Sequence, residues 1–286
     1  MARVLCVGIA TLDIINRVEQ YPAEDSEVRA LAQSRRMGGN AANTATVLAQ
    51  LGAHAFWVGN LAQPAEIVER DFARYGVDTS LAVRLPDAVM PTSYILLSEA
   101  SGSRSIVHFR DLPEYQAEHF LKLDLRSFDW VHFEGRAIDQ LVPMLWRARG
   151  MCGLPVSLEI EKPRRGVEEL FEQADLLLFS RDYAQAQGFS DAAALLRSLP
   201  QGVLATCAWG AQGAWAIDED SRLLHVVAPP LDSVVDTLGA GDVFNAGIID
   251  GRLQGMVAAD GLTHACRLAG RKCGQSGFDD LTGTLS

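Results

Sequence analysis

The chain has 286 residues, of which 48% are hydrophobic, 21% charged and 7% aromatic. This composition excludes an intrinsically disordered chain, and no apolar run approaches the ~18 residues of a membrane-spanning helix. Asp plus Glu is 36 against 25 Lys plus Arg, a formal charge of −11, so we expect neither nucleic acid nor a membrane as a partner.

Short apolar runs alternate with amphipathic segments along most of the chain, which predicts an α/β fold. The near-continuous apolar runs at 176–179 and 203–205 are typical of a parallel sheet covered by helices on both faces. The predicted strands are 3–9, 55–59, 129–133, 155–160, 174–180, 202–208, 214–217 and 223–227. The predicted helices are 41–51, 64–75, 138–148, 191–198, 241–253 and 257–273.

Two stretches break this alternation. Residues 14–37 contain strand-like pieces without a long helix, and residues 92–110 are typical of a hairpin that turns at 100–103. Because such strands do not easily join a covered parallel sheet, we expect them to form a small sheet that projects from the main body. The sequence thus predicts a single domain over 1–286, with a lid subdomain from 14–37 and 92–110. A projecting sheet beside a cleft can be a lid or only a dimer contact.

The cysteines indicate the compartment. Cys6, Cys152, Cys207, Cys266 and Cys273 are scattered and form no C-x-x-C pair, which predicts free thiols rather than disulfides or a zinc site. The apolar run at 4–12 is followed by no small-residue cleavage pattern, and we interpret it as a first strand rather than a signal peptide. We therefore expect a cytoplasmic protein.

The strongest chemical signal is the run from Asp236 to Gly247, which opens a predicted helix. Gly239, Ala240 and Gly241 leave a backbone with almost no side chain at the helix N-terminus, where free N–H groups and the helix dipole attract an anion. Asp242 lies in the first turn and could accept a proton from a nucleophilic hydroxyl. The alternative is a simple N-cap, and the local pattern does not decide between the two.

A second glycine pair, Gly38 and Gly39, leads into the predicted helix at 41–51. Asn40 and Asn43 are three residues apart and share a helix face, and their amides suit the hydroxyls of a sugar. Taken alone, Asn40 is more typical of a helix cap than of a ligand. Asp13 is expected at the carboxyl end of the first strand, where open α/β sheets bind ligands.

Several catalytic motifs are absent from the sequence. Neither G-x-G-x-x-G nor the P-loop pattern is present, which argues against a nucleotide-dependent oxidoreductase. No G-x-S-x-G nucleophile motif occurs, and the six histidines show no metal-ligand spacing.

The two glycine motifs, 38–43 and 236–242, together resemble the signatures of the PfkB (ribokinase-like) family of carbohydrate kinases. The likeness extends nearly end to end. Within the family the chain is most similar to the branch that phosphorylates ketohexoses such as fructose. The segments that carry this closer likeness are 21–27, 133–136, 159–163, 270–274 and 277–279.

The resemblance implies a Rossmann-like αβα sandwich with a β-sheet lid, ATP as phosphoryl donor, Mg²⁺, and a homodimer that forms through the lids. It assigns the catalytic base to Asp242, and the anion hole to Gly239, Ala240 and Gly241. The sugar ligands that it implies are Asp13, Gly39, Asn40 and Asn43. On the nucleotide side it implies that Arg104 reaches the ATP phosphates from the lid and that Cys266 forms part of the adenine pocket. The nucleotide-binding turn that it implies consists of Gly210, Ala211, Gln212 and Gly213.

Two departures from the family pattern leave parts of this assignment open. Ser180-Arg181-Asp182-Tyr183 stands where many members carry an Asn-x-x-Glu motif, so the metal ligands are undetermined. Residues 108–111 differ from the usual sequence of the ketohexose branch, which leaves the sugar open. The alternatives are another sugar, a sugar phosphate held by Arg110 and Arg136, a nucleoside, or a catalytically silent sugar-binding protein.

Overall fold

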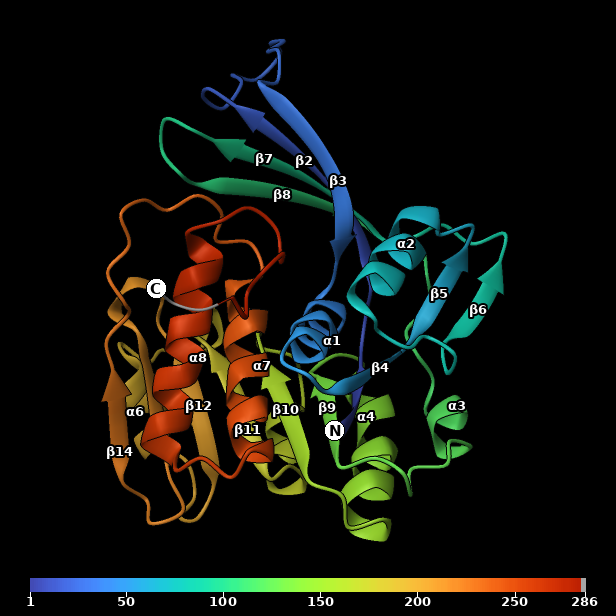
Figure 1. Ribbon diagram of the computed structural model, residues 1–286, viewed down its shortest axis with the longest axis vertical. Helices are drawn as coiled ribbons and strands as arrows, with labels where there is room; N and C mark the ends of the chain where they lie inside the picture. Colours follow the sequence, from blue (N-terminus) through green and yellow to red (C-terminus); the bar gives the residue numbers. More distant parts are fainter. Residues whose placement is uncertain (284–286) are drawn as a thin grey trace.

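The computed structural model describes residues 1–283, and its centre is an eight-stranded sheet in the order β14-β13-β12-β11-β10-β9-β1-β4 (Figure 1). Six of these strands, namely β12, β11, β10, β9, β1 and β4, run parallel to one another. At the other edge, β13 pairs antiparallel with β12, and β14 pairs antiparallel with β13. The predicted parallel sheet is therefore correct except at this edge. The strands are β1 (Arg3–Val7), β4 (His54–Val58), β9 (Trp130–Glu134), β10 (Val156–Ile160), β11 (Leu176–Ser180), β12 (Leu204–Ala208), β13 (Ala214–Ile217) and β14 (Leu223–Val226).

Helices cover both faces of the sheet, because alternate strand residues are apolar on each side. In β1, Val4 and Cys6 belong to one buried cluster, and Leu5 and Val7 belong to the other. The first cluster packs against α1 (Asn40–Gln50), α2 (Glu66–Tyr75), α7 (Ala240–Leu253) and α8 (Ala258–Cys273). The second packs against α3 (Ala117–Leu121), α4 (Ile138–Leu145), α5 (Arg181–Ala186) and α6 (Ala192–Arg197). This arrangement is the αβα sandwich that the sequence predicts.

Shorter helical segments join these elements. They are a π-helical segment η1 (Trp146–Met151) and two 3₁₀ segments, η2 (Val167–Gln173) and η3 (Gly210–Gln212). Within residues 1–283, no helix combines the length and the apolar character needed to cross a membrane. All five cysteines lie in the described part of the chain and are free.

A second, four-stranded sheet has the order β3-β2-β7-β8, and we call it the small sheet. Figure 1 shows it standing beyond the carboxyl ends of the central parallel strands. Its strands are β2 (Thr11–Val18), β3 (Ala32–Gly38), β7 (Thr92–Ser98) and β8 (Arg104–Phe109). A further parallel pair, β5 (Asn60–Gln63) and β6 (Val83–Pro86), has no counterpart in the sequence-based prediction.

The first apolar run differs from its prediction. It does not form one strand, because β1 ends at Val7 and the chain enters the small sheet at Thr11. Gly8 lies between them against β9, where a Cβ atom would be only 2.5 Å from Glu134 Oε2. Asp13 is therefore not at the end of the first strand, as expected, but inside β2. An apolar run alone carries no signal for a break between two sheets.

Candidate active site

Acidic side chains gather at the carboxyl edge of the central sheet. Glu134 is the last residue of β9, and Glu159, its register partner on β10, is the last but one of that strand; Glu161 follows β10 directly. Glu159 Oε1 accepts hydrogen bonds from Asn40 Nδ2 and Asn245 Nδ2, both at 3.1 Å. Its Oε2 is buried without a hydrogen-bond partner among the described residues. These glutamates are at predicted strand ends, so strand adjacency was the signal that could have identified them.

The N-terminus of α7 forms the second part of the site. Gly239 caps the helix with φ of +83°, and a Cβ atom there would lie 2.5 Å from the Phe278 ring. The helix proper begins at Ala240. At Gly241 a Cβ atom would meet no atom of the described chain within 4 Å, so packing does not explain the glycine. Among the described residues, the N–H groups of Gly241 and Asp242 find no backbone acceptor. This open, amide-lined helix end suits an anion.

Asp242, which carries one of these N–H groups, lies in the first turn of α7. Its side chain is buried, and its Oδ2 accepts a hydrogen bond of 2.7 Å from Asn43 Nδ2. Burial raises the pKa of Asp242 well above its ordinary value, and the charges of Glu161, Glu134 and Asp13 add to the rise. Gly239 is the N-cap, and among the described residues the Asp242 carboxylate bonds to Asn43 and not to an N–H group of its own helix, so the N-cap interpretation is wrong. A buried carboxylate with a raised pKa is a suitable proton acceptor once it is ionised.

The start of α1 brings the predicted sugar ligands beside Asp242. Gly39 is the N-cap, with φ of +99°, and a Cβ atom would lie 2.5 Å from the carbonyl oxygen of Ile9. Asn40 is the first helical residue, and its side chain points to Glu159 rather than to its own helix end. The capping role favoured by the sequence is therefore incorrect for Asn40. Asn43, one turn later, connects α1 to Asp242.

One row of polar side chains crosses the small sheet. The strand register places Arg36, Asp13, Ser93 and His108 next to one another on β3, β2, β7 and β8. Thr11 Oγ1 donates to Asp13 Oδ1 at 2.8 Å, and Ser93 Oγ lies 3.1 Å from His108 Nδ1. Burial raises the pKa of Asp13. Burial, together with nearby arginines, lowers the pKa of His108 below its usual value. Sequence reasoning identified Asp13 but missed its neighbours Ser93 and His108, since the row exists only in the paired register.

Arg104 begins β8 and connects the small sheet to the loop that precedes α7. Its Nη1 donates to Thr237 Oγ1 at 2.9 Å, two residues before Gly239. The side chain is exposed, and most of its donor capacity is directed to solvent. It therefore has the position and the free donors needed to meet an anion held by α7.

The predicted nucleotide-side residues form a separate cluster. Gly210, Ala211 and Gln212 form η3, and Gly213 follows with φ of +89°. A Cβ atom at Gly213 would collide with the carbonyl oxygen of Val226. Cys266 Sγ lies 4.0 Å from the same oxygen, and burial raises the pKa of this thiol to about 11. The turn and Cys266 thus meet at the end of β14.

An ion-pair centre that the sequence did not reveal holds the loop that precedes α7. Asp236 Oδ2 contacts Arg36 Nη2 at 2.9 Å and Lys272 Nζ at 3.0 Å, and Lys272 is fully buried. The other oxygen of Asp236 accepts from the N–H of Leu238 at 2.9 Å. Asp236 thereby ties the small sheet and α8 to the residues just before Gly239.

The segment at the expected metal motif has another role. Ser180 Oγ accepts from the N–H of Tyr183 at 2.9 Å and donates to the carbonyl oxygen of Glu161 at 2.5 Å. Ser180 thus caps α5 and fixes the backbone at Glu161, whereas Asp182 is exposed beside Arg181. In residues 1–283, no group of three or more potential ligands forms a ready-made metal site.

The chain is similar to proteins of known family and structure. The family model described as pfkB family carbohydrate kinase matches residues 1–282. The chain is 41% identical to ketohexokinase of Mus musculus, over 98% of both chains. It is 28% identical to an ATP-dependent ribose-1-phosphate kinase of Halopiger xanaduensis, over 87% of this chain and 84% of that one. A ribokinase of Cryptococcus neoformans solved with ADP shares the fold, with a TM-score of 0.77, 20% identity, and coverage of 97% and 95% of the two chains.

Proposed function

The chain belongs to the pfkB family of carbohydrate kinases and is an ATP-dependent sugar kinase, and from this we propose that its acceptor is a ketohexose such as fructose. The observation that carries the proposal is the position of Asp242, which is buried in the first turn of α7 beside the open N–H groups and is hydrogen-bonded to Asn43. The 41% identity to a ketohexokinase supports the choice of sugar. Members with other acceptors exist, since one relative is a ribose-1-phosphate kinase.

In this proposal the sugar lies between α1 and the small sheet. Asp13, Asn40 and Asn43 hydrogen-bond its hydroxyls, and the backbone of Gly39 lies beside the ring. Asp242 accepts the proton of the attacking hydroxyl while the sugar oxygen bonds to the γ-phosphorus of ATP. The bond from that phosphorus to the bridging oxygen breaks, and ADP leaves. Phosphoryl transfer requires positioning and charge stabilisation more than covalent chemistry, which suits a site of this kind.

The anion hole of the proposal is the start of α7. The N–H groups of Gly239, Gly241 and Asp242 are open to the transferring phosphoryl oxygens, whereas that of Ala240 donates to the carbonyl oxygen of Thr237 at 3.2 Å. The positive end of the helix dipole adds to their effect. The turn at 210–213 and Cys266 hold the nucleoside part of ATP. A chain with a net charge of −11 binds a polyanion in this way through local backbone groups, without a basic surface.

The acidic edge of the sheet suits Mg²⁺ held together with ATP. Glu159 has a buried, unpartnered oxygen, and the charges of Asp242, Glu134 and Glu161 raise its pKa further after burial. Mg²⁺ prefers oxygen ligands and is usually held by one or two carboxylates plus substrate phosphates, rather than by a protein cage. We assign Glu159 and Glu161 as the carboxylates on this side. The ion, when bound, neutralises charge on the phosphates and offsets the repulsion among these carboxylates.

Replacing Arg104 with Ala should impair the nucleotide step. Arg104 already reaches the loop of Gly239, and closure of the small sheet would pair its guanidinium with phosphate oxygens. A hydrogen bond to a charged group contributes about 1.5–3 kcal/mol, so kcat/KM for ATP should fall roughly 10- to 100-fold. Steady-state kinetics with varied ATP at saturating sugar measure this loss, and calorimetry measures sugar binding alone, which should change little.

The matched control for that substitution is Arg126→Ala. Arg126 is similarly exposed and paired with Asp124, remote from the anion-hole loop. Its replacement should leave both constants unchanged. Wild-type constants for Arg104→Ala would instead show that the small sheet serves only as a contact between subunits.

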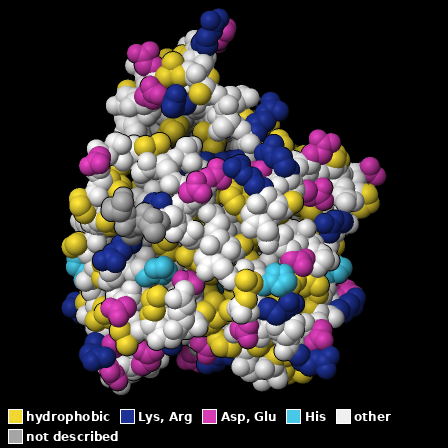
Figure 2. Space-filling model, viewed as in Figure 1, with side chains coloured by type: hydrophobic (Ala, Val, Ile, Leu, Met, Phe, Trp, Pro, Cys, Tyr) yellow, Lys and Arg dark blue, Asp and Glu magenta, His cyan; other side chains and the backbone are white. Residues whose placement is uncertain are grey.

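The outer face of the small sheet supports a homodimer. Tyr94 and Val107 are cross-strand partners there, and their exposed fractions are 50% and 71%. Phe109 shares this face and is 53% exposed. Figure 2 shows hydrophobic side chains on the projecting part of the molecule, with charged ones at its tip. A second copy would cover this apolar face, and sedimentation velocity decides between monomer and dimer.

Free cysteines favour a cytoplasmic location for the assembly.

The acceptor itself is tested with a panel of ketoses, aldoses, sugar phosphates and nucleosides, with ADP release as the measured signal. Fructose or another ketohexose should show the highest kcat/KM. Phosphorus NMR of the product then identifies the hydroxyl that has reacted. A nucleoside or an aldose with the highest value would contradict the proposed acceptor but not the kinase activity.

A further inference from the structure

A cavity lies beside the acceptor site, beneath the end of β8. Its walls are the chain that follows β1, the end of β9 and the loop at 110–115. Ile9, Ala10 and Glu134 belong to these walls, and the first two also pack against Gly39. A sugar held at Asp13 and Asn43 can therefore extend its far end into this cavity.

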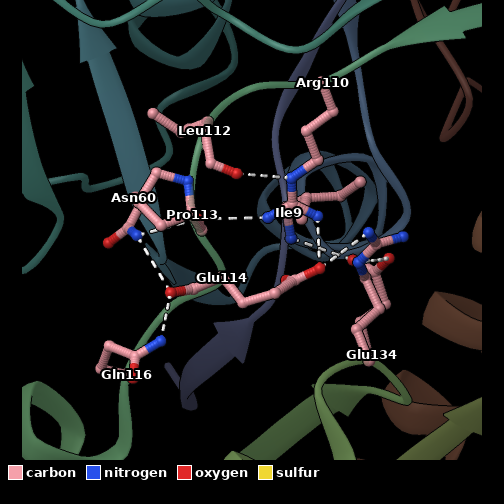
Figure 3. Close-up of polar contacts among 9 residues, drawn as sticks. Ile9, Asn60, Arg110, Leu112, Pro113, Glu114, Gln116 and Glu134 are labelled. Carbon is pink, nitrogen blue, oxygen red and sulfur yellow. Dashed lines mark hydrogen bonds and ion pairs between the residues drawn. The ribbon is translucent and has the colours of Figure 1, made fainter.

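A chain of alternating charges crosses the cavity (Figure 3). Glu114 Oε1 receives a hydrogen bond of 2.5 Å from Arg110 Nη1 and one of 3.0 Å from Arg136 Nη2. Arg136 Nε lies 3.7 Å from Glu134 Oε1. Two guanidinium groups and two carboxylates thus meet, and their formal charges cancel.

Glu114 is held firmly between the two arginines. Asn60 Nδ2 and Gln116 Nε2 both donate to its backbone oxygen, at 3.2 and 2.8 Å. Burial raises the pKa of the Glu114 carboxyl, but the hydrogen bonds and charges of Arg136 and Arg110 outweigh it and leave the pKa below its usual value. The carboxylate is therefore ionised at neutral pH and occupies the place where the two guanidiniums would hold an anion.

Arg110 has little capacity left for a ligand. Its Nε donates to the carbonyl oxygen of Leu112 at 2.9 Å, and its Nη2 to that of Pro113 at 3.2 Å. With the Glu114 contact, each of its three nitrogens already has an acceptor. Arg110 thus serves to hold the loop and Glu114 in place.

Other polar groups of the cavity lack partners. The Tyr115 hydroxyl, Asn60 Oδ1 and Arg136 Nε are buried without a hydrogen-bond partner among the described residues. Tyr115 and Asn60 are only 7% and 8% exposed, and both line the cavity. Burial raises the pKa of Tyr115, so its hydroxyl keeps its proton. A hydroxyl, an acceptor and an N–H group of this kind suit the hydroxyls of an uncharged ligand.

We propose that Glu114 sets the charge selectivity of the acceptor site: the cavity receives an uncharged, hydroxyl-bearing end of the sugar, and Glu114 excludes a phosphorylated end. The inference rests on the proposed function and narrows its acceptor to free sugars. A phosphate entering the cavity would lie beside Glu114 and Glu134, or would have to displace Glu114 from Arg110 and Arg136. Repulsion by a fixed like charge is an effective means of rejecting a competing ligand.

The test compares fructose with fructose 1-phosphate and fructose 6-phosphate for the wild-type enzyme and for Glu114→Gln. The wild type should strongly prefer free fructose. The substitution removes the carboxylate and releases two guanidiniums. The ratio of kcat/KM for a phosphorylated sugar to kcat/KM for fructose should therefore rise at least about tenfold. Calorimetry without ATP should show tighter binding of fructose 6-phosphate to the variant.

Three further variants keep the test decisive. Glu114→Asp retains the charge and should retain the wild-type ratio. Arg110→Met removes one cation and should not move the ratio toward phosphates. Glu118→Gln is the matched control, because Glu118 is exposed and pairs with Lys122 outside the cavity.

The possible failures can be told apart. A folded Glu114→Gln enzyme with an unchanged ratio and unchanged fructose 6-phosphate binding overturns the inference, and so does a wild type that prefers phosphorylated sugars. If Glu114→Gln does not fold, Arg110→Met supplies the test. A rise in its kcat/KM ratio of phosphorylated sugar to fructose would equally contradict the inference. A wild type that phosphorylates no ketose at all would instead refute the proposed acceptor.

Discussion

Asp242→Asn should lower kcat by about 10²–10⁴, the usual contribution of a positioned general base. The amide has nearly the shape of the carboxylate and can remain beside Asn43, but it cannot accept a proton from the sugar hydroxyl. The fold should persist, because removing a buried charge that neighbouring carboxylates already disfavour costs little. Single-turnover kinetics with saturating ATP and sugar measure the loss, and calorimetry measures the retained sugar affinity.

A substitution of the same kind on the same helix supplies the control. Asp250 lies two turns further along α7 and pairs with His264 and Gln254, away from the acceptor site. Asp250→Asn should therefore keep near-normal turnover. If Asp242→Asn retained more than half of the wild-type kcat, Asp242 could not be the base, and another group would have to take the proton.

The central sheet could be predicted from the sequence because its signals are local. Apolar runs such as 176–179 and 203–205 have one explanation in a chain of this composition, namely strands covered on both faces. Gly76 and Gly239 lie at helix ends and have positive φ, a backbone conformation that glycine adopts more easily than other residues. The open N–H groups at the start of α7 were predictable for the same reason, since they need no distant partner.

What could not be predicted depends on pairing between distant segments. Asp13 was expected at the end of β1, but it lies in β2, because a short Gly-Ile-Ala break does not reveal that the chain changes sheets. The row that contains Ser93 and His108 requires the register of three strand pairs. The contact of Asn40 with Glu159 joins residues 119 positions apart. Spacing within one helix gives no information about such a partner.

Asp236→Asn should lower the free energy of unfolding by about 3–5 kcal/mol, the usual effect of breaking a buried ion pair from one side. Lys272 is fully buried and would keep only uncharged acceptors, among them the backbone oxygen of residue 236. Arg36 would lose its carboxylate as well. Both cations would then be buried or half-buried without a counter-charge. Urea unfolding at neutral pH measures the loss.

The pH dependence of this loss follows from the titration of Asp236. Burial raises the pKa of its carboxyl, but Arg36 and Lys272 outweigh that effect and hold it below the ordinary value. A carboxyl whose pKa is lowered on folding contributes stability above its unfolded-state pKa, and this contribution disappears as the pH falls through the folded-state pKa. The difference between wild type and Asp236→Asn should therefore be full at neutral pH and shrink in acid.

Two further variants separate the ion pair from a general effect of the substitution. Asp220→Asn removes an exposed carboxylate paired with Arg222, and it should cost less than about 1 kcal/mol. The double variant Asp236→Asn/Lys272→Met removes both buried partners, so it should be more stable than Asp236→Asn alone, because no uncompensated ammonium remains. If the double variant instead had a clearly lower free energy of unfolding than Asp236→Asn, Lys272 would stabilise the protein through packing. Its charge would then contribute nothing to the loop that holds Gly239.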